Sequence, residues 1–404
     1  MVRKFLSELF FNTSLGNGFY SEISLGTFIV LFIFIISIYL LIKFSKNIKI
    51  QFLYGIGLLL SSITTINVLR YKPYGGDAVI YCELTALSKS SNLSIYNIEY
   101  KYTFNYPPIF EQLLGFLCEF GYQTNYYYFL LPAFFLFLLI LKKENKNISL
   151  NFLYIFGAFL ALRWVLKTGN FVMLELIFLI LFIWYYKKKS HLSYVFLILF
   201  GIQRIWFLLL LPILFILDNR DIFEKVKTIT ITTLIVVSVN INYLNEFIAR
   251  FFESSSQYSI LRELPGHNTP SIYLGLLKIL NIDSNLFLLF IYVLLVNFIL
   301  FLILRKYQMS SDIKLMTIFI FLLITNPYLK PYHFIFIIPF LLLVNDIFLK
   351  DKKNIIIAII IPNLFWIIFS NLSSGTTSGF FQLLFIIAFI INLISLDKET
   401  NSID

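Results

Sequence analysis

Charged residues are scarce in this sequence of 404 residues. Asp, Glu, Lys and Arg together make up 13%, whereas soluble domains are near a quarter charged. Hydrophobic residues make up 59%, and Phe alone contributes 47 residues. This balance excludes an ordinary soluble domain. It predicts an all-α polytopic membrane protein, because a helix satisfies its own backbone hydrogen bonds in lipid.

The sequence also lacks the patterns that bind metals and nucleotides. It has two cysteines, its three histidines lie far apart, and no aspartates stand at one-residue spacing. No glycine-rich nucleotide-binding motif is present. We therefore expect a metal-independent protein that needs no cofactor.

Basic residues outnumber acidic ones, 32 against 22, but the lysines stand in short clusters between apolar runs. Seven turns hold 19 of the 32 Lys and Arg residues, and the positive-inside rule places such turns in the cytoplasm. Membrane lipids are thus expected partners and nucleic acid is not. The turns are 43–50, 142–146, 187–191, 218–227, 305–314, 350–353 and 397–404.

Apolar runs predict about 13 transmembrane segments in a single integral-membrane domain, 1–404, with no appended soluble domain. Several are shorter than the roughly 20 residues that cross a bilayer upright. The pair 192–203 and 205–217 reads as one tilted helix or as two broken ones, and the charge pattern favours two. The runs are 26–43, 51–69, 125–141, 149–166, 171–186, 192–203, 205–217, 228–245, 285–304, 315–329, 333–349, 354–370 and 378–395.

The polar stretch 70–124 is the longest interruption of the apolar pattern, and we expect it to be a large outer loop with amphipathic helices. A second outer loop is expected at 246–284. The first loop contains Asp77, the only Asp among the first 217 residues, directly after two glycines. Asp77 is either a general base for a hydroxyl group or an N-cap of the following helix. Cys82 and Cys118 form either a disulfide or two buried thiols.

Other polar residues are expected on the same side of the membrane. Arg204, at the break between two apolar runs, is either functional or extends to the membrane interface. Lys330 and His333 stand beside two prolines, and cations gathered there suit a phosphate. His267 and Asn268 precede a helix, where free N–H groups favour an anion, although this is also an ordinary cap. Glu175, inside an apolar run, receives no role.

Six segments together resemble the GT-C class of integral-membrane glycosyltransferases, and most closely glycosyltransferase family 87. The resemblance spans roughly residues 70–345, and it rests on the order and the common side of the motifs. In that family they are an acidic residue in the first outer loop, a Tyr-Pro-Pro, polar turns between helices, and a late Pro- and His-containing segment. Here they read GGDAVIY, YTFNYPP, KTGNFVMLEL, GIQRIWFLLLLP, GHNTPSIYLGLLKIL and NPYLKPYHF.

The resemblance implies inverting transfer of a mannose-like hexose or pentose from a polyprenyl-phosphate donor. The acceptor would be a lipid-linked molecule or a glycan on the extracytoplasmic face of the plasma membrane. Asp77 would deprotonate the acceptor, and Arg204, Lys330 and His333 would hold the departing phosphate. A transporter, flippase or polymerase of lipid-linked polysaccharide stays as the alternative. The further substrate-binding residues would be Tyr81, Tyr106, Asn170, Gln203, His267 and Asn268.

Overall fold

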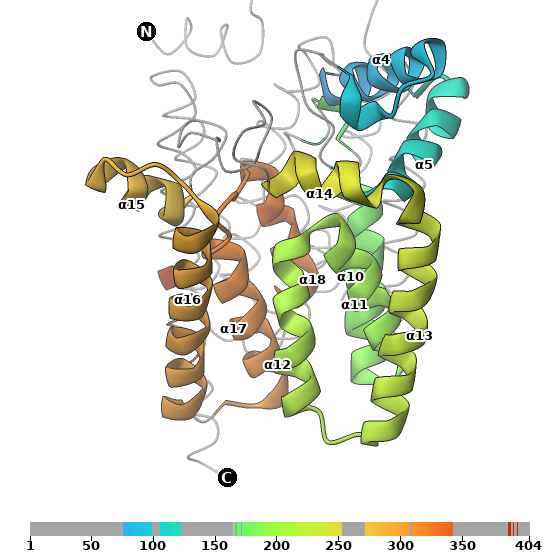
Figure 1. The fold of residues 1–404 in the computed structure, drawn as a ribbon. Helices are drawn as coiled ribbons and strands as arrows, with labels where there is room; N and C mark the ends of the chain where they lie inside the picture. Colours follow the sequence, from blue (N-terminus) through green and yellow to red (C-terminus); the bar gives the residue numbers. More distant parts are fainter. Residues whose placement is uncertain are drawn as a thin grey trace, which may run out of the picture.

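The computed structural model describes residues 76–98, 106–122, 165, 168–170, 172–252, 271–307, 309–341, 387, 388, 391 and 394. These residues form helices and no strand, which confirms the all-α prediction for this part of the chain (Figure 1). The helices are α4 Gly76–Ser91, α5 Pro108–Glu119, α10 Val172–Lys187, α11 Leu192–Gln203, α12 Leu210–Leu217, α13 Ile222–Asn240, α14 Leu244–Phe252, α15 Ile272–Leu280, α16 Leu286–Lys306, α17 Ser311–Ile324 and α18 Ile337–Leu341. Short 3-10 turns are η1 Ile95–Asn97, η2 Ile205–Leu209, η3 Ile241–Tyr243 and η5 Pro331–Phe336.

Helix α16 is the one described helix that is long and apolar enough to cross a membrane. Its 21 residues rise about 31 Å, which matches the hydrocarbon thickness of a bilayer. Asn285 caps its start through a bond from the Leu288 N–H to Oδ1 (2.9 Å), and Arg305 and Lys306 end it. Only 17% of its most apolar window is buried, so most of its apolar surface faces away from the protein. Such a surface fits lipid and not the core of a soluble domain.

Six of the predicted apolar runs fall, apart from single positions, outside the described residues. They therefore stay predictions, and with them the number of 13 segments. The runs concerned are 26–43, 51–69, 125–141, 149–166, 354–370 and 378–395.

The chain breaks between the apolar runs 192–203 and 205–217, as the charge pattern predicts. Helix α11 ends at Gln203, the backbone of Arg204 leaves the helical region (φ −134°, ψ 75°), and η2 and α12 follow. The reversal packs η2 against α11 so closely that a Cβ added to Gly201 would lie 2.4 Å from Leu208 Cδ2. Any larger residue at this contact would force the Leu208 side chain to move.

Three of the basic turns lie together at one end of the helical bundle. Arg220, after α12, donates to the Ser190 carbonyl and to Ser193 Oγ (3.0 Å) beside the turn that follows α10. Tyr194 donates to Asp218 (2.7 Å), which ties α11 to the same corner. The link between α16 and α17 lies at this end as well, whereas α4, α5, α14 and α15 lie at the other (Figure 1). The segregation of basic turns from the polar stretch thus holds for the described residues.

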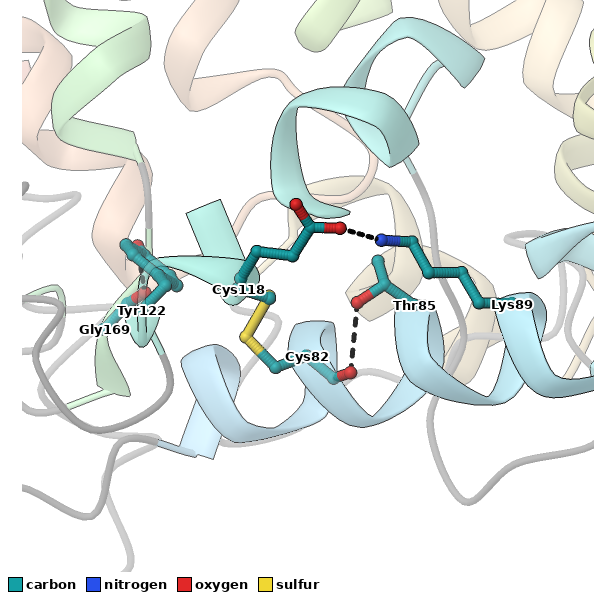
Figure 2. Close-up of a disulfide and its surroundings, with 7 residues drawn as sticks. Cys82, Thr85, Lys89, Cys118, Tyr122 and Gly169 are labelled. Carbon is teal, nitrogen blue, oxygen red and sulfur yellow. Dashed lines mark hydrogen bonds and ion pairs between the residues drawn. A yellow bond between two sulfur atoms is a disulfide. The ribbon is translucent and has the colours of Figure 1, made fainter. Parts of the chain in front are cut away.

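Helices α4 and α5 form a cap held by the Cys82–Cys118 disulfide (Figure 2). Pro107 and Pro108 start α5, because proline suits the first turn of a helix, where its missing N–H has no intrahelical partner. The cap reaches the bundle at Ile109, whose N–H donates to Asn240 Oδ1 (2.8 Å) at the end of α13. The structure thus selects the disulfide between the two alternatives for the cysteines. The Lys89–Glu119 ion pair connects the C-terminal ends of the same two helices.

Helix α5 is apolar on its buried side, as expected for an amphipathic helix of the first outer loop, but its outer side carries exposed apolar residues as well. It buries Phe110, Leu114 and Leu117 against the rest of the protein, whereas Phe116 and, directly after the helix, Phe120 are exposed. The buried residues fix how α5 lies, and therefore where the preceding residue pair Tyr106–Pro107 is placed.

The disulfide gives the first prediction. Because the chain has two cysteines and both are in the bridge, we expect no uptake of an alkylating reagent without reductant and two equivalents after reduction, read by intact mass. Replacing both by Ser should lower stability by on the order of 2–4 kcal/mol, since the unfolded chain regains the freedom of a long loop. Two alkyl groups on unreduced protein would contradict the bridge.

Candidate functional site

Asp77 lies in the first turn of α4 and contacts the turn before α10, far away in sequence. Its Oδ2 accepts from Asn170 Nδ2 (2.8 Å), and its carboxylate also hydrogen-bonds to the Thr168 side chain. Because α4 is described from Gly76 onward, Asp77 stands inside the helix and not at the N-cap position. The contacts with Asn170 and Thr168 direct the Asp77 side chain to the bundle. The N-terminal end of α4 favours its negative charge.

The turn 168–170 has a conformation that presents two side chains to Asp77. Gly169 takes φ 69°, a left-handed value that glycine adopts without steric cost. Its carbonyl accepts from the Tyr122 hydroxyl (2.7 Å), and its N–H donates to the Val165 carbonyl (3.0 Å). The turn is therefore anchored on both sides, and Thr168 and Asn170 have fixed positions next to the carboxylate.

Two tyrosines extend this hydrogen-bonded chain into the cap. Asn170 Nδ2 donates to the Tyr81 hydroxyl (3.2 Å), which in turn lies 3.0 Å from the Tyr106 hydroxyl. Tyr96 donates to the Tyr106 carbonyl (2.5 Å) and so holds the backbone just before the two prolines. Tyr81, Tyr96 and Tyr106 are all buried. The chain of bonds therefore connects α4, the start of α5 and the start of α10.

Arg204 forms a buried ion pair with Glu175 of α10. Its Nε and Nη2 donate to the two carboxylate oxygens at 2.8 and 2.9 Å, in a fork that only Arg can make. The guanidinium carbon also lies 5.4 Å from the ring centres of both Tyr106 and Tyr332. The Glu175 side chain is fully buried and that of Arg204 is 12% exposed, so Arg204 does not extend to solvent as the interface interpretation requires.

Lys330 directly precedes η5, and His333 lies within it. The Lys330 N–H donates to His333 Nδ1 (3.1 Å), so this nitrogen must be unprotonated and the proton of the neutral ring is on Nε2. His333 is 3% exposed, and its Nε2 has no hydrogen-bond partner among the described residues. A buried N–H without a partner costs free energy, and a ligand oxygen would satisfy it.

The ionisable groups at this end influence one another. Burial raises the pKa of Asp77, while hydrogen bonds from Asn170 and Thr168 and the charges of Arg204 and Lys330 act in the opposite direction. Burial lowers the pKa of Lys330 to about 8; Arg204 acts in the same direction and Asp77 against it. Lys330 and Asp77 are therefore close enough that a change of charge on one alters the other.

The structure brings together most of the residues that the sequence analysis selects. Gln203 precedes Arg204 and has a buried Oε1 without a partner among the described residues. His267 and Asn268 lie outside the described residues. In the described ranges no three His, Cys, Asp or Glu side chains lie together as metal ligands would. The residues that gather are Asp77, Tyr81, Tyr106, Asn170, Arg204, Lys330 and His333.

Sequence reasoning missed three members of this cluster: Thr168, Glu175 and Tyr332. Glu175 had a usable signal, because an acid inside an apolar run needs a cation at the same depth, and Arg204 ends a neighbouring run. Thr168 and Tyr332 stand in the quoted segments KTGNFVMLEL and NPYLKPYHF, but their neighbours across the bundle are decided only by folding.

The comparisons with known proteins return nothing. No family model matches the chain, no curated protein matches it, and neither does any solved structure.

The buried ion pair gives the second prediction. Glu175→Gln should lower the unfolding free energy by about 3–5 kcal/mol, because it leaves the Arg204 charge buried without its counter-ion. The melting temperature in detergent measures this. The double variant Glu175→Gln with Arg204→Gln should be more stable than the single variant.

The exposed pair Lys89–Glu119 is the matched control, since its side chains are 60% and 63% exposed. Glu119→Gln should change stability by no more than about 1 kcal/mol. Equal losses in Glu175→Gln and Glu119→Gln would contradict the structural role assigned to the buried pair.

Proposed function

We propose that the chain is a GT-C-type membrane glycosyltransferase of about 13 transmembrane segments. It transfers a mannose-like hexose or pentose from a polyprenyl-phosphate donor to a lipid-linked or glycan acceptor. The observation that carries the proposal is the gathering of Asp77, Arg204 and Lys330 at one end of an apolar bundle, beside the Nε2–H of His333, which has no partner among the described residues. A carboxylate next to cations suits a reaction in which a proton is removed and a phosphate departs.

In the proposed reaction Asp77 is the general base. The acceptor oxygen attacks the anomeric carbon, and its proton moves to the Asp77 carboxylate. The bond between the anomeric carbon and the phosphate oxygen breaks, and the phosphate leaves with the electron pair. A single displacement of this kind inverts the configuration of the sugar. The raised pKa of Asp77 makes its carboxylate a stronger base than an exposed Asp.

The cations hold the departing phosphate in this proposal. Two of the five Arg204 N–H groups are used by Glu175, and the others have no partner among the described residues. Lys330 supplies a second positive charge, and His333 a neutral N–H donor. The phosphate gains about one negative charge as the sugar leaves, and Asp77 loses one by protonation, so the net charge of the site does not change.

The membrane accounts for how the reactants arrive. Both substrates carry lipid or lie at the membrane surface, and α16 together with the exposed apolar residues of α13 presents an apolar surface to the bilayer. The basic turns at the opposite end indicate the cytoplasmic side by the positive-inside rule. The site would accordingly face the extracytoplasmic side of the plasma membrane, where no nucleotide is needed.

The test of this function is Asp77→Asn, assayed with a panel of radiolabelled polyprenyl-phosphate sugars and membrane lipid as acceptor. Asn keeps the shape of the side chain and removes its basicity. Sugar transfer should fall by roughly 10²-fold or more, while the melting temperature and donor binding stay near those of the wild type. Donor binding without transfer in the wild type would favour a transporter or flippase. Near-normal transfer by Asp77→Asn would remove Asp77 as the base.

The sidedness is tested by cysteine labelling in intact cells, since both native cysteines are in the disulfide. Ser90→Cys, on the exposed surface of α4, should react with an impermeant thiol reagent. Ser311→Cys, at the exposed start of α17, should react only after permeabilisation, because it lies at the end with the basic turns. The reverse pattern would place the site in the cytoplasm.

A further inference from the structure

Asn170 is the residue whose contacts the proposed reaction does not explain. It is 2% exposed, and both polar atoms of its side chain are engaged in hydrogen bonds. Its Oδ1 accepts from the Val172 N–H (3.0 Å) at the start of α10, and its Nδ2 donates to Asp77 and Tyr81. Both N–H groups of this buried amide are used within the protein, so it has no donor left for a substrate.

The orientation of this amide follows from its neighbours. A backbone N–H can only donate, so the atom that faces Val172 must be the oxygen. The nitrogen is then forced to face Asp77, and it donates to a carboxylate oxygen at 2.8 Å. The cap of α10 thus sets which group the carboxylate meets, and a rotated amide would lose both bonds at once.

We propose that Asn170 is a positioning residue for Asp77, and that its amide orients the carboxylate and keeps it ionised at the working pH. A hydrogen-bond donor to a carboxylate stabilises its ionised form. Asn170 therefore lowers the pKa of Asp77 and counteracts burial, which raises it. For its activity readout this inference rests on the proposed glycosyl transfer. The role is separate from the substrate binding expected for Asn170 from the sequence.

Other groups also act on Asp77, and all stay unchanged in the test. The charged ones are Arg204 and Lys330, and Thr168 adds a hydrogen bond. The titratable hydroxyls that interact with Asp77 are those of Tyr81, Tyr106, Tyr122 and Tyr332.

Two replacements of Asn170 test the proposal. Asn170→Asp keeps an oxygen for the cap but turns the donor into a second carboxylate, so the pair holds its last proton to higher pH. Asn170→Ser keeps a capping hydroxyl, adds no charge and does not reach Asp77. Both should move the acidic limit of the pH–rate profile upward, by roughly one pH unit or more for Asn170→Asp and less for Asn170→Ser. The alkaline limit should stay in place in Asn170→Ser, because Lys330 is unaffected.

Asn240 is the matched control. It is 4% exposed, its Oδ1 also accepts a backbone N–H, from Ile109, and its Nδ2 donates to the Val236 carbonyl (2.7 Å). Asn240→Asp should lower stability without moving the acidic limit. Two results would overturn the positioning role. One is that Asn240→Asp moves the acidic limit of the pH–rate profile as far as Asn170→Ser does. The other is that a folded Asn170→Ser keeps the acidic limit of the wild type.

A readout besides activity separates this proposal from the proposed function. The carboxyl stretch of Asp77, identified by infrared difference against Asp77→Asn, reports its titration directly. The midpoint of this titration should shift to higher pH in both Asn170 variants, even if no donor in the panel is transferred. A wild-type titration in both would overturn the proposal whatever the enzyme assay shows.

Discussion

The fork between Arg204 and Glu175 is the interaction on which the site end of the bundle depends. A guanidinium taken out of water costs several kcal/mol unless an opposite charge and good hydrogen bonds offset the loss. Glu175 supplies both, from the first turn of α10, and the rings of Tyr106 and Tyr332 cover the guanidinium. These contacts determine where α10, η2, η5 and the start of α5 can lie relative to one another.

The cap adds a second constraint from outside the bundle. The Cys82–Cys118 bridge fixes α5 against α4, and the Asn240–Ile109 bond fixes the start of α5 on α13. Tyr106 stands just before that start, so the same two constraints place its ring on Arg204 and its hydroxyl on Tyr81. The carboxylate of Asp77 and the guanidinium of Arg204 are thereby linked through Asn170, Tyr81 and Tyr106, although they lie 127 positions apart in the sequence.

Composition and charge pattern were enough to predict the helical class, the break at Arg204 and the end of the bundle at which Asp77, Arg204 and Lys330 lie. These features follow from local chemistry: apolar length, basic turns and polar interruptions. The side-chain contacts within the site could not be predicted from these features. Glu175 looked isolated because its counter-ion follows another helix, and the disulfide stayed open because spacing does not reveal whether the two cysteines face each other. The bonds of Asn170 to Val172 and Asp77 could not be predicted either, because they exist only after folding.

An arriving anion would affect the charges of Arg204 and Lys330 differently. Arg204 already has a carboxylate at hydrogen-bond distance, so its charge is balanced before any ligand binds. Lys330 has a pKa of about 8 because burial and Arg204 disfavour its charge. A phosphate beside Lys330 would favour the protonated amine, and protonation of Asp77 would remove a negative charge that favours it before the reaction. In the proposed reaction Lys330 is therefore the group that responds to both events, whereas Arg204 keeps a fixed charge and a fixed orientation throughout.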